Sequence, residues 1–102
     1  MGNLVKIVRK DELKEGQAKV VRVGDEEIAV FRVDHEFFAT RNKCLHRGGP
    51  LGDGELAGHY VTCPWHGWTY DVRTGSFGII PTLRVKTYKI TEDGEDLFVE
   101  LA

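Results

Sequence analysis

The sequence predicts an all-β domain, and three observations support this prediction. Short runs rich in Val, Ile and aromatic residues recur along the chain, turn-forming residues separate them, and no amphipathic helix of convincing length occurs. The 102 residues are close to the commonest size of a single domain. We therefore expect one domain, without an internal repeat or a linker.

The first part of the chain predicts one strand, one helical turn and a meander of three strands. The strand is expected over residues 4–8 and the helical turn over residues 11–14. The meander strands are expected over residues 18–23, 27–33 and 36–40. Gly24-Asp25 and Asp34-His35 stand between these strands and predict hairpin turns.

The last part of the chain predicts two further strands. Thr74-Gly75 indicates a tight turn, and the alternation of residues 84–91 predicts one continuous strand. Asp93-Gly94 then predicts a hairpin turn into a final strand over residues 96–101.

Two short motifs between these parts indicate a metal centre. Cys-Leu-His at residues 44–46 and Cys-Pro-Trp-His at residues 63–66 are separated by 16 residues and contain the only two cysteines. Zinc sites usually pair like ligands closely, whereas each motif here offers one thiolate and one imidazole. This mixture favours a dinuclear cluster in which each iron takes two like ligands from two loops. A zinc site, a disulfide and incidental thiols remain as alternatives.

With their glycine-rich surroundings, the two motifs resemble the Rieske family of 2Fe-2S proteins. The segments are Cys-Leu-His-Arg-Gly-Gly-Pro-Leu-Gly and Cys-Pro-Trp-His-Gly-Trp. The resemblance implies one 2Fe-2S cluster, with Cys44 and Cys63 on one iron and His46 and His66 on the other. It also implies the family's fold, a small antiparallel β-sandwich with an inserted cluster-binding subdomain. The single domain, residues 1–102, would then have a basal part over residues 1–42 and 72–102 and a cluster-binding part over residues 43–71.

The resemblance is to the low-potential, soluble branch of that family. Rieske proteins of respiratory cytochrome complexes carry a bracing disulfide at positions that correspond here to Gly49 and Trp65. A serine that donates to the cluster in the high-potential branch is replaced by Trp68, whereas Tyr70 resembles the phenol that donates to a cysteine sulfur. We therefore expect a potential at the low end of the Rieske range of about −150 to +300 mV.

Other residues near the motifs are expected to surround the cluster. Backbone N–H donors are expected around Arg47 and Gly49 and around residues 65–67, where glycines remove the obstruction of a Cβ. Pro81 resembles the proline of the loop that covers the cluster in this family. Leu45 and Trp65 are expected to offer an apolar docking face.

The remaining residues near the site have simpler interpretations. For Pro50 and Leu51, packing of the loops competes with a role in docking. His35 and His59 have no ligand partner at motif spacing and are expected to be surface turn residues. A rim of mixed charge is expected around the site, formed by Arg41, Lys43, Arg47, Asp53 and Glu55.

The overall charge argues against two classes of partner. With 14 basic and 16 acidic residues, the chain has no net positive field to attract nucleic acid or an anionic membrane. No apolar run of transmembrane length occurs, and both cysteines are already assigned to the metal. The sequence therefore predicts a cytoplasmic protein, and we expect a monomer.

The resemblance implies a Rieske-type ferredoxin that passes single electrons from a flavin-containing reductase to a terminal oxygenase. Such a protein is an electron-transfer component and not an enzyme by itself. The main alternative is a subunit similar to the small Rieske-like subunit of assimilatory nitrite reductases. An oxygenase in its own right is disfavoured, because only His35 and His59 remain for a second iron site.

Overall fold

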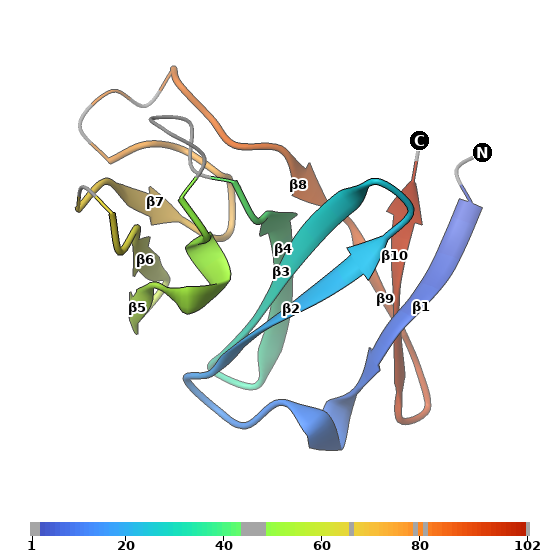
Figure 1. Ribbon diagram of the computed structural model, residues 1–102. Coiled ribbons are helices and arrows are strands. Elements are labelled where there is room, and N and C mark those ends of the chain that lie inside the picture. Colours follow the sequence, from blue (N-terminus) through green and yellow to red (C-terminus); the bar gives the residue numbers. More distant parts are fainter. Residues whose placement is uncertain (1–2, 44–48, 66, 79, 81, 102) are drawn as a thin grey trace.

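The computed structural model describes residues 3–43, 49–65, 67–78, 80 and 82–101. These residues form three antiparallel sheets (Figure 1). The first sheet contains β1 (Asn3–Arg9), β10 (Asp96–Leu101) and β9 (Ile90–Asp93), in that order. The second contains β2 (Ala18–Val23), β3 (Glu26–Val33), β4 (Glu36–Arg41) and β8 (Thr87–Tyr88). The third contains β5 (Glu55–Ala57), β6 (Tyr60–Thr62) and β7 (Thr69–Asp71).

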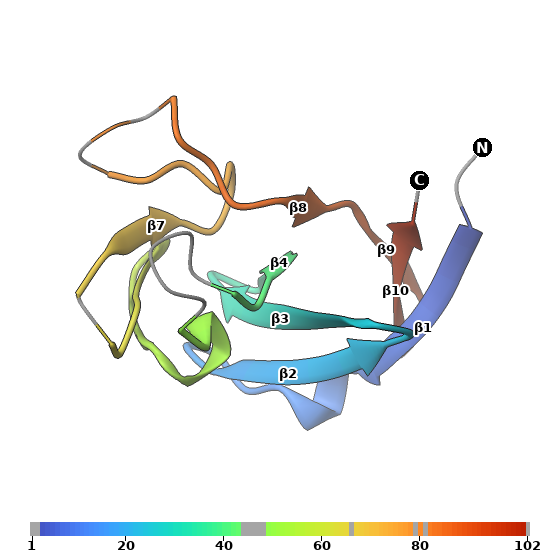
Figure 2. The same ribbon diagram turned by 45° about the horizontal axis from the view of Figure 1, so that its top comes forward.

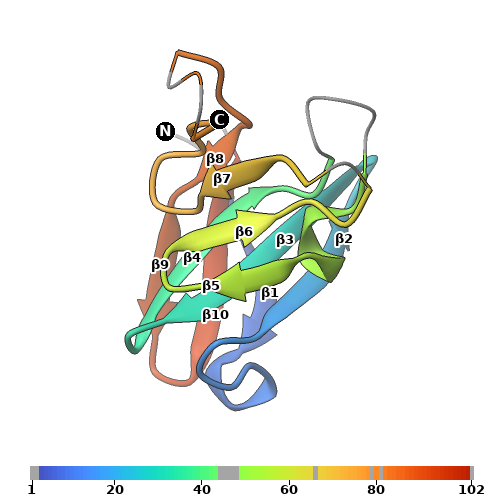
Figure 3. The same cartoon turned by 90° about the vertical axis from the view of Figure 1, so that its left-hand side faces the viewer.

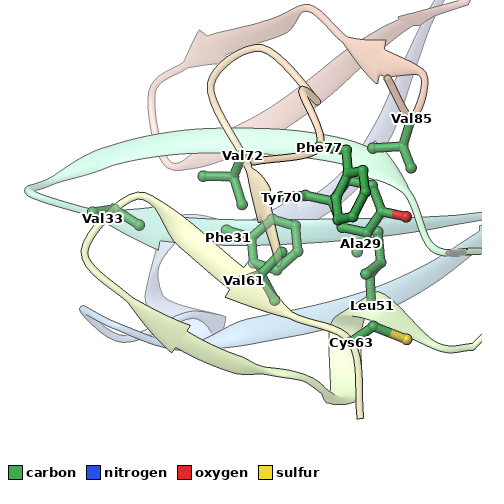
Figure 4. Packing of buried hydrophobic residues seen from close by; sticks show 10 residues of the cluster. All are labelled: Ala29, Phe31, Val33, Leu51, Val61, Cys63, Tyr70, Val72, Phe77 and Val85. Atoms are coloured by element: carbon green, nitrogen blue, oxygen red, sulfur yellow. The ribbon is translucent and has the colours of Figure 1, made fainter. Parts of the chain in front are cut away.

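The second sheet lies between the other two (Figures 1 and 2). It contributes to two hydrophobic cores. Residues 28–31 of β3 are all buried. Because successive side chains of a strand point to opposite faces, Ile28 and Val30 enter the core shared with the first sheet. Ala29 and Phe31 enter the core shared with the third sheet, shown in Figure 4. The continuous apolar run of β3 thus reflects burial on both faces.

The structure confirms the all-β prediction and most of the predicted strands. β2 has the predicted bounds, β3 and β4 are each one residue longer than predicted, and β1 is one residue longer at both ends. Asp34 and His35 both have positive φ, 52° and 65°, as the paired turn residues of a type I′ hairpin require. The predicted helical turn is present as a 3-10 turn, η1 (Lys10–Glu12).

The prediction of one continuous strand over residues 84–91 is wrong. Arg84 forms an isolated bridge with Ser76, β8 pairs with β4 in the second sheet, and β9 pairs with β10 in the first. Val85 enters the core beside the third sheet, whereas Tyr88 enters the core beside the first. Alternation identifies which side chains point inward, but it does not identify the sheet that each short segment joins.

The third sheet lies within residues 55–71, inside the predicted cluster-binding part, and sequence analysis predicted no strands there. Figure 3 shows β5, β6 and β7 as neighbouring strands facing the viewer. A second 3-10 turn, η2 (Leu51–Asp53), precedes this sheet. The division of the chain at residues 43 and 71 stays a prediction. No helix in the described part of the chain is long and apolar enough to cross a membrane.

Candidate metal centre

Of the four expected ligands, the structure describes Cys63. The other three, Cys44, His46 and His66, lie outside the described residues, as do Leu45, Arg47 and Pro81. Cys63 directly follows β6, and its side chain is buried in the core beside the third sheet (Figure 4). Two backbone hydrogen bonds close the turn after it: the N–H of Cys63 donates to the Trp68 carbonyl, 2.7 Å, and the N–H of Gly67 donates to the Cys63 carbonyl, 3.0 Å.

Gly49 brings the first motif segment into contact with the second. A Cβ placed on Gly49 would stand 2.7 Å from the Cys63 sulfur and 3.0 Å from Cγ of Trp65. Only glycine fits this position, because real Cβ atoms do not approach other atoms so closely. A buried thiol beside open backbone is what a thiolate-bound cluster requires, since main-chain N–H groups must reach its sulfurs. The described part of the site therefore fits a 2Fe-2S cluster.

Trp65 is 57% exposed, although it covers Gly49 on one side. Two further large apolar side chains, Ile80 and Leu83, are also exposed. They belong to the loop between Phe77 and β8, which is fastened to β7 because the Gly78 N–H donates to the Thr69 carbonyl, 2.9 Å. This arrangement leaves apolar surface on the loops that flank the candidate site.

Trp68 and Tyr70 point into the core that contains Cys63. The Trp68 ring is stacked on Phe77, with ring centroids 4.2 Å apart and planes 10° apart. Tyr70 is fully buried, and its ring centroid lies 5.7 Å from that of Phe77. Tyr70 is therefore a buried phenol in the same core as the thiol. Phe77 contacts both rings, and the sequence did not indicate this role because Phe77 lies outside both metal-binding motifs.

The residues that follow Gly49 pack the loop instead of forming a docking face. Leu51 is fully buried, so the docking interpretation is wrong for this residue. Pro50 is half-buried and forms an isolated β-bridge with Lys43. Of the expected charged rim, Arg41 pairs with Glu26 at 3.5 Å, whereas Asp53 and Glu55 are exposed.

His35 is an exposed turn residue, as expected, but the expectation for His59 needs correction. His59 is in a turn, yet its side chain is only 24% exposed. Its ring meets Phe38 edge-on, with centroids 5.7 Å apart, and its Nε2 lies 3.9 Å from the Asp34 carboxylate. His59 thus connects the turn between β5 and β6 to the turn between β3 and β4, a contact that motif spacing cannot reveal.

In the second sheet, Tyr88 donates a hydrogen bond to the Glu26 carboxylate, 2.8 Å. This bond lowers the pKa of Glu26, and the positive charges of Lys86 and Arg41 act in the same direction. Burial, followed by the bond to Glu26, raises the pKa of Tyr88 to about 12. The pair joins β8 to the start of β3 across the second sheet.

Comparisons with known proteins give consistent results. The family profile described as "Rieske [2Fe-2S] domain" matches residues 3–89. The ferredoxin component of the naphthalene 1,2-dioxygenase system of Pseudomonas aeruginosa is 35% identical over 92 residues, covering 89% of this chain and 88% of that protein. The ferredoxin of carbazole 1,9a-dioxygenase from Nocardioides aromaticivorans IC177 superposes with a TM-score of 0.90 at 28% identity, covering 97% of this chain and 98% of that one. A chain in the complex of reduced oxygenase and oxidized ferredoxin in carbazole 1,9a-dioxygenase has a TM-score of 0.87 at 28% identity, covering 95% and 92%.

Proposed function

The chain belongs to the Rieske 2Fe-2S domain family, and on this premise we propose that it is the ferredoxin of a multicomponent oxygenase system. It carries single electrons from a flavin-containing reductase to a terminal oxygenase and is not a catalyst by itself. The observation that carries this proposal is the match to a dioxygenase ferredoxin component over 89% of this chain and 88% of that protein. The solved oxygenase–ferredoxin complex supports an oxygenase as the acceptor.

We assign Cys44 and Cys63 to one iron and His46 and His66 to the other. The bound cluster supplies a one-electron centre whose two neutral imidazoles place its potential above that of four-thiolate clusters. The chain's own residues provide the surroundings of the cluster. Cys63 is shielded from water, and Gly49 places main chain without a Cβ beside the Cys63 sulfur. The absorbance of the purified protein and its electron paramagnetic resonance after reduction test this assignment, because a zinc site gives neither signal.

We propose that the partner docks on the exposed apolar side chains that flank the site, Trp65, Ile80 and Leu83, together with Leu45. The test introduces one charge. Leu83→Glu should slow electron transfer to the oxygenase by about tenfold and leave the absorbance spectrum intact, because the docking face would lose apolar burial while no contact to Gly49 or Cys63 changes. Stopped-flow mixing with the partner protein measures this rate.

Leu4 offers a matched control, since it is 55% exposed and lies in β1, away from the candidate site. Leu4→Glu makes the same change of charge on a similarly exposed apolar side chain and should leave the rate unchanged. If Leu4→Glu slowed transfer as much as Leu83→Glu, the docking face would lie elsewhere.

The main alternative, a small subunit of a larger reductase, requires a tight complex of fixed stoichiometry. The relatives reported above are ferredoxin components, which favours a carrier that associates transiently. We therefore propose a cytoplasmic monomer. Size-exclusion chromatography of the protein purified from its own source would contradict this if the chain eluted only in a large complex.

A further inference from the structure

The segment that carries Cys44 and His46 leaves the second sheet after β4 and returns at η2. Its two ends meet at Asn42. The Asn42 carbonyl accepts a hydrogen bond from the Leu51 N–H, 2.6 Å, and its side-chain Oδ1 accepts a second from the Gly52 N–H, 2.7 Å. One residue therefore closes the base of this segment through both its backbone and its side chain.

Asn42 is itself held by Glu27 of β3. The Asn42 N–H donates to the Glu27 carbonyl, 2.9 Å, and Nδ2 donates to the Glu27 carboxylate, 3.3 Å. These contacts fix the orientation of the Asn42 amide. Its oxygen must face the Gly52 N–H, which needs an acceptor, and its NH2 group must face the Glu27 carboxylate, which needs a donor. Asn42 is 3% exposed, so water does not readily replace a lost bond.

The close packing of η2 leaves little room for adjustment. A Cβ on Gly52 would collide with the Val20 side chain and would stand 3.0 Å from Oδ1 of Asn42. The η2 turn thus rests directly on β2 and on the Asn42 amide. Any reorientation of that amide would break its hydrogen bond with the Gly52 N–H.

We propose that Asn42 is a positioning residue for the cluster: its amide, oriented by Glu27, sets the geometry of the segment that supplies Cys44 and His46. The proposal rests on the proposed function, because it takes these two residues as ligands. Asn42 thereby influences how long the cluster is retained and what reduction potential it has.

The experiment uses the cluster-loaded protein and exchanges the donor and acceptor roles of Asn42 and Glu27. Asn42→Asp keeps an acceptor for the Gly52 N–H but leaves two carboxylates facing each other without a donor. We expect it to release iron to a chelator about tenfold faster and to change the visible circular dichroism and the reduction potential. Glu27→Gln alone retains an acceptor and should behave like the wild type.

The double variant, Asn42→Asp with Glu27→Gln, decides the question. The glutamine amide can donate to the aspartate, which restores a complementary pair with reversed roles, so retention, dichroism and potential should return close to wild-type values. If Asn42→Asp gave no soluble protein, a double variant that holds the cluster would still support the proposal. A double variant without the cluster would overturn the proposal.

Thr40→Val is the matched control. Thr40 is 1% exposed, and its hydroxyl donates to the Arg41 carbonyl, 3.0 Å, so the variant loses one hydrogen bond in which neither Asn42 nor η2 takes part. It should lower the melting temperature without changing iron release, dichroism or potential. Equal changes in Thr40→Val and Asn42→Asp, or no change in Asn42→Asp, would overturn the proposal.

A wild-type protein without a 2Fe-2S spectrum would instead refute the proposed function.

Discussion

Gly49 and Cys63 lie so close together that a Cβ on Gly49 would stand 2.7 Å from the cysteine sulfur. This contact joins the two motif segments at a buried thiol, and Trp65 covers it from the solvent side. A side chain at position 49 would have to displace either the sulfur or the indole.

Gly49→Ala should therefore reduce the iron content of the purified protein and destabilise it by about 1–3 kcal/mol through overpacking. Iron-to-protein ratio and thermal unfolding measure these effects. Gly78→Ala is the control, because a Cβ there meets only the Thr69 carbonyl, at an ordinary 3.6 Å. A full iron content in Gly49→Ala would show that the sulfur has room to move.

Trp68→Ser should have two opposite consequences. The hydroxyl would stand where the high-potential branch of the family has one, so the potential should rise, on the order of 50 mV for one hydrogen bond of about 1 kcal/mol. Loss of the stack on Phe77 should lower the free energy of unfolding by about 2 kcal/mol. Trp68→Phe keeps an aromatic ring without adding a hydroxyl, so it should show neither the rise in potential nor the full loss of unfolding free energy. Voltammetry and thermal unfolding measure the two effects separately.

Tyr70→Phe should lower the potential by a similar amount, because it removes a buried hydroxyl from the core that contains Cys63. Tyr60→Phe makes the same chemical change on an exposed side chain of β6 and should leave the potential as it is. Equal potentials in wild type and Tyr70→Phe would show that this phenol does not tune the cluster.

Tyr88 should make stability depend on alkaline pH. Its pKa is raised from 10.0 to about 12 in the folded protein, so the neutral phenol stabilises the fold below pH 10. This contribution, about 2 kcal/mol, is lost as the pH rises toward 12. Tyr88→Phe lacks the titrating group, so its melting temperature should fall less between pH 9 and pH 12 than that of the wild type. Parallel curves would contradict this.

The chemistry of the candidate site could be predicted from the sequence because it depends on residue type and local spacing. Two motifs that each pair a thiolate with an imidazole already indicate the expected cluster, and the turn residues around Gly24 and Asp34 indicate the meander. The hydrophobic alternation of the strands is equally local, and it correctly predicted an all-β domain.

Contacts between residues far apart in the chain were decided only by the tertiary structure. Residues 84–91 divide between two sheets because their side chains enter different cores, which alternation alone does not show. Tyr88 reaches Glu26 across 62 positions, and His59, in the turn between β5 and β6, contacts Phe38 of β4. Asn42 carries no motif signal at all. Its importance arises because packing brings β3 and η2 to the same buried amide. The polar groups of this amide must find their hydrogen-bond partners within the protein.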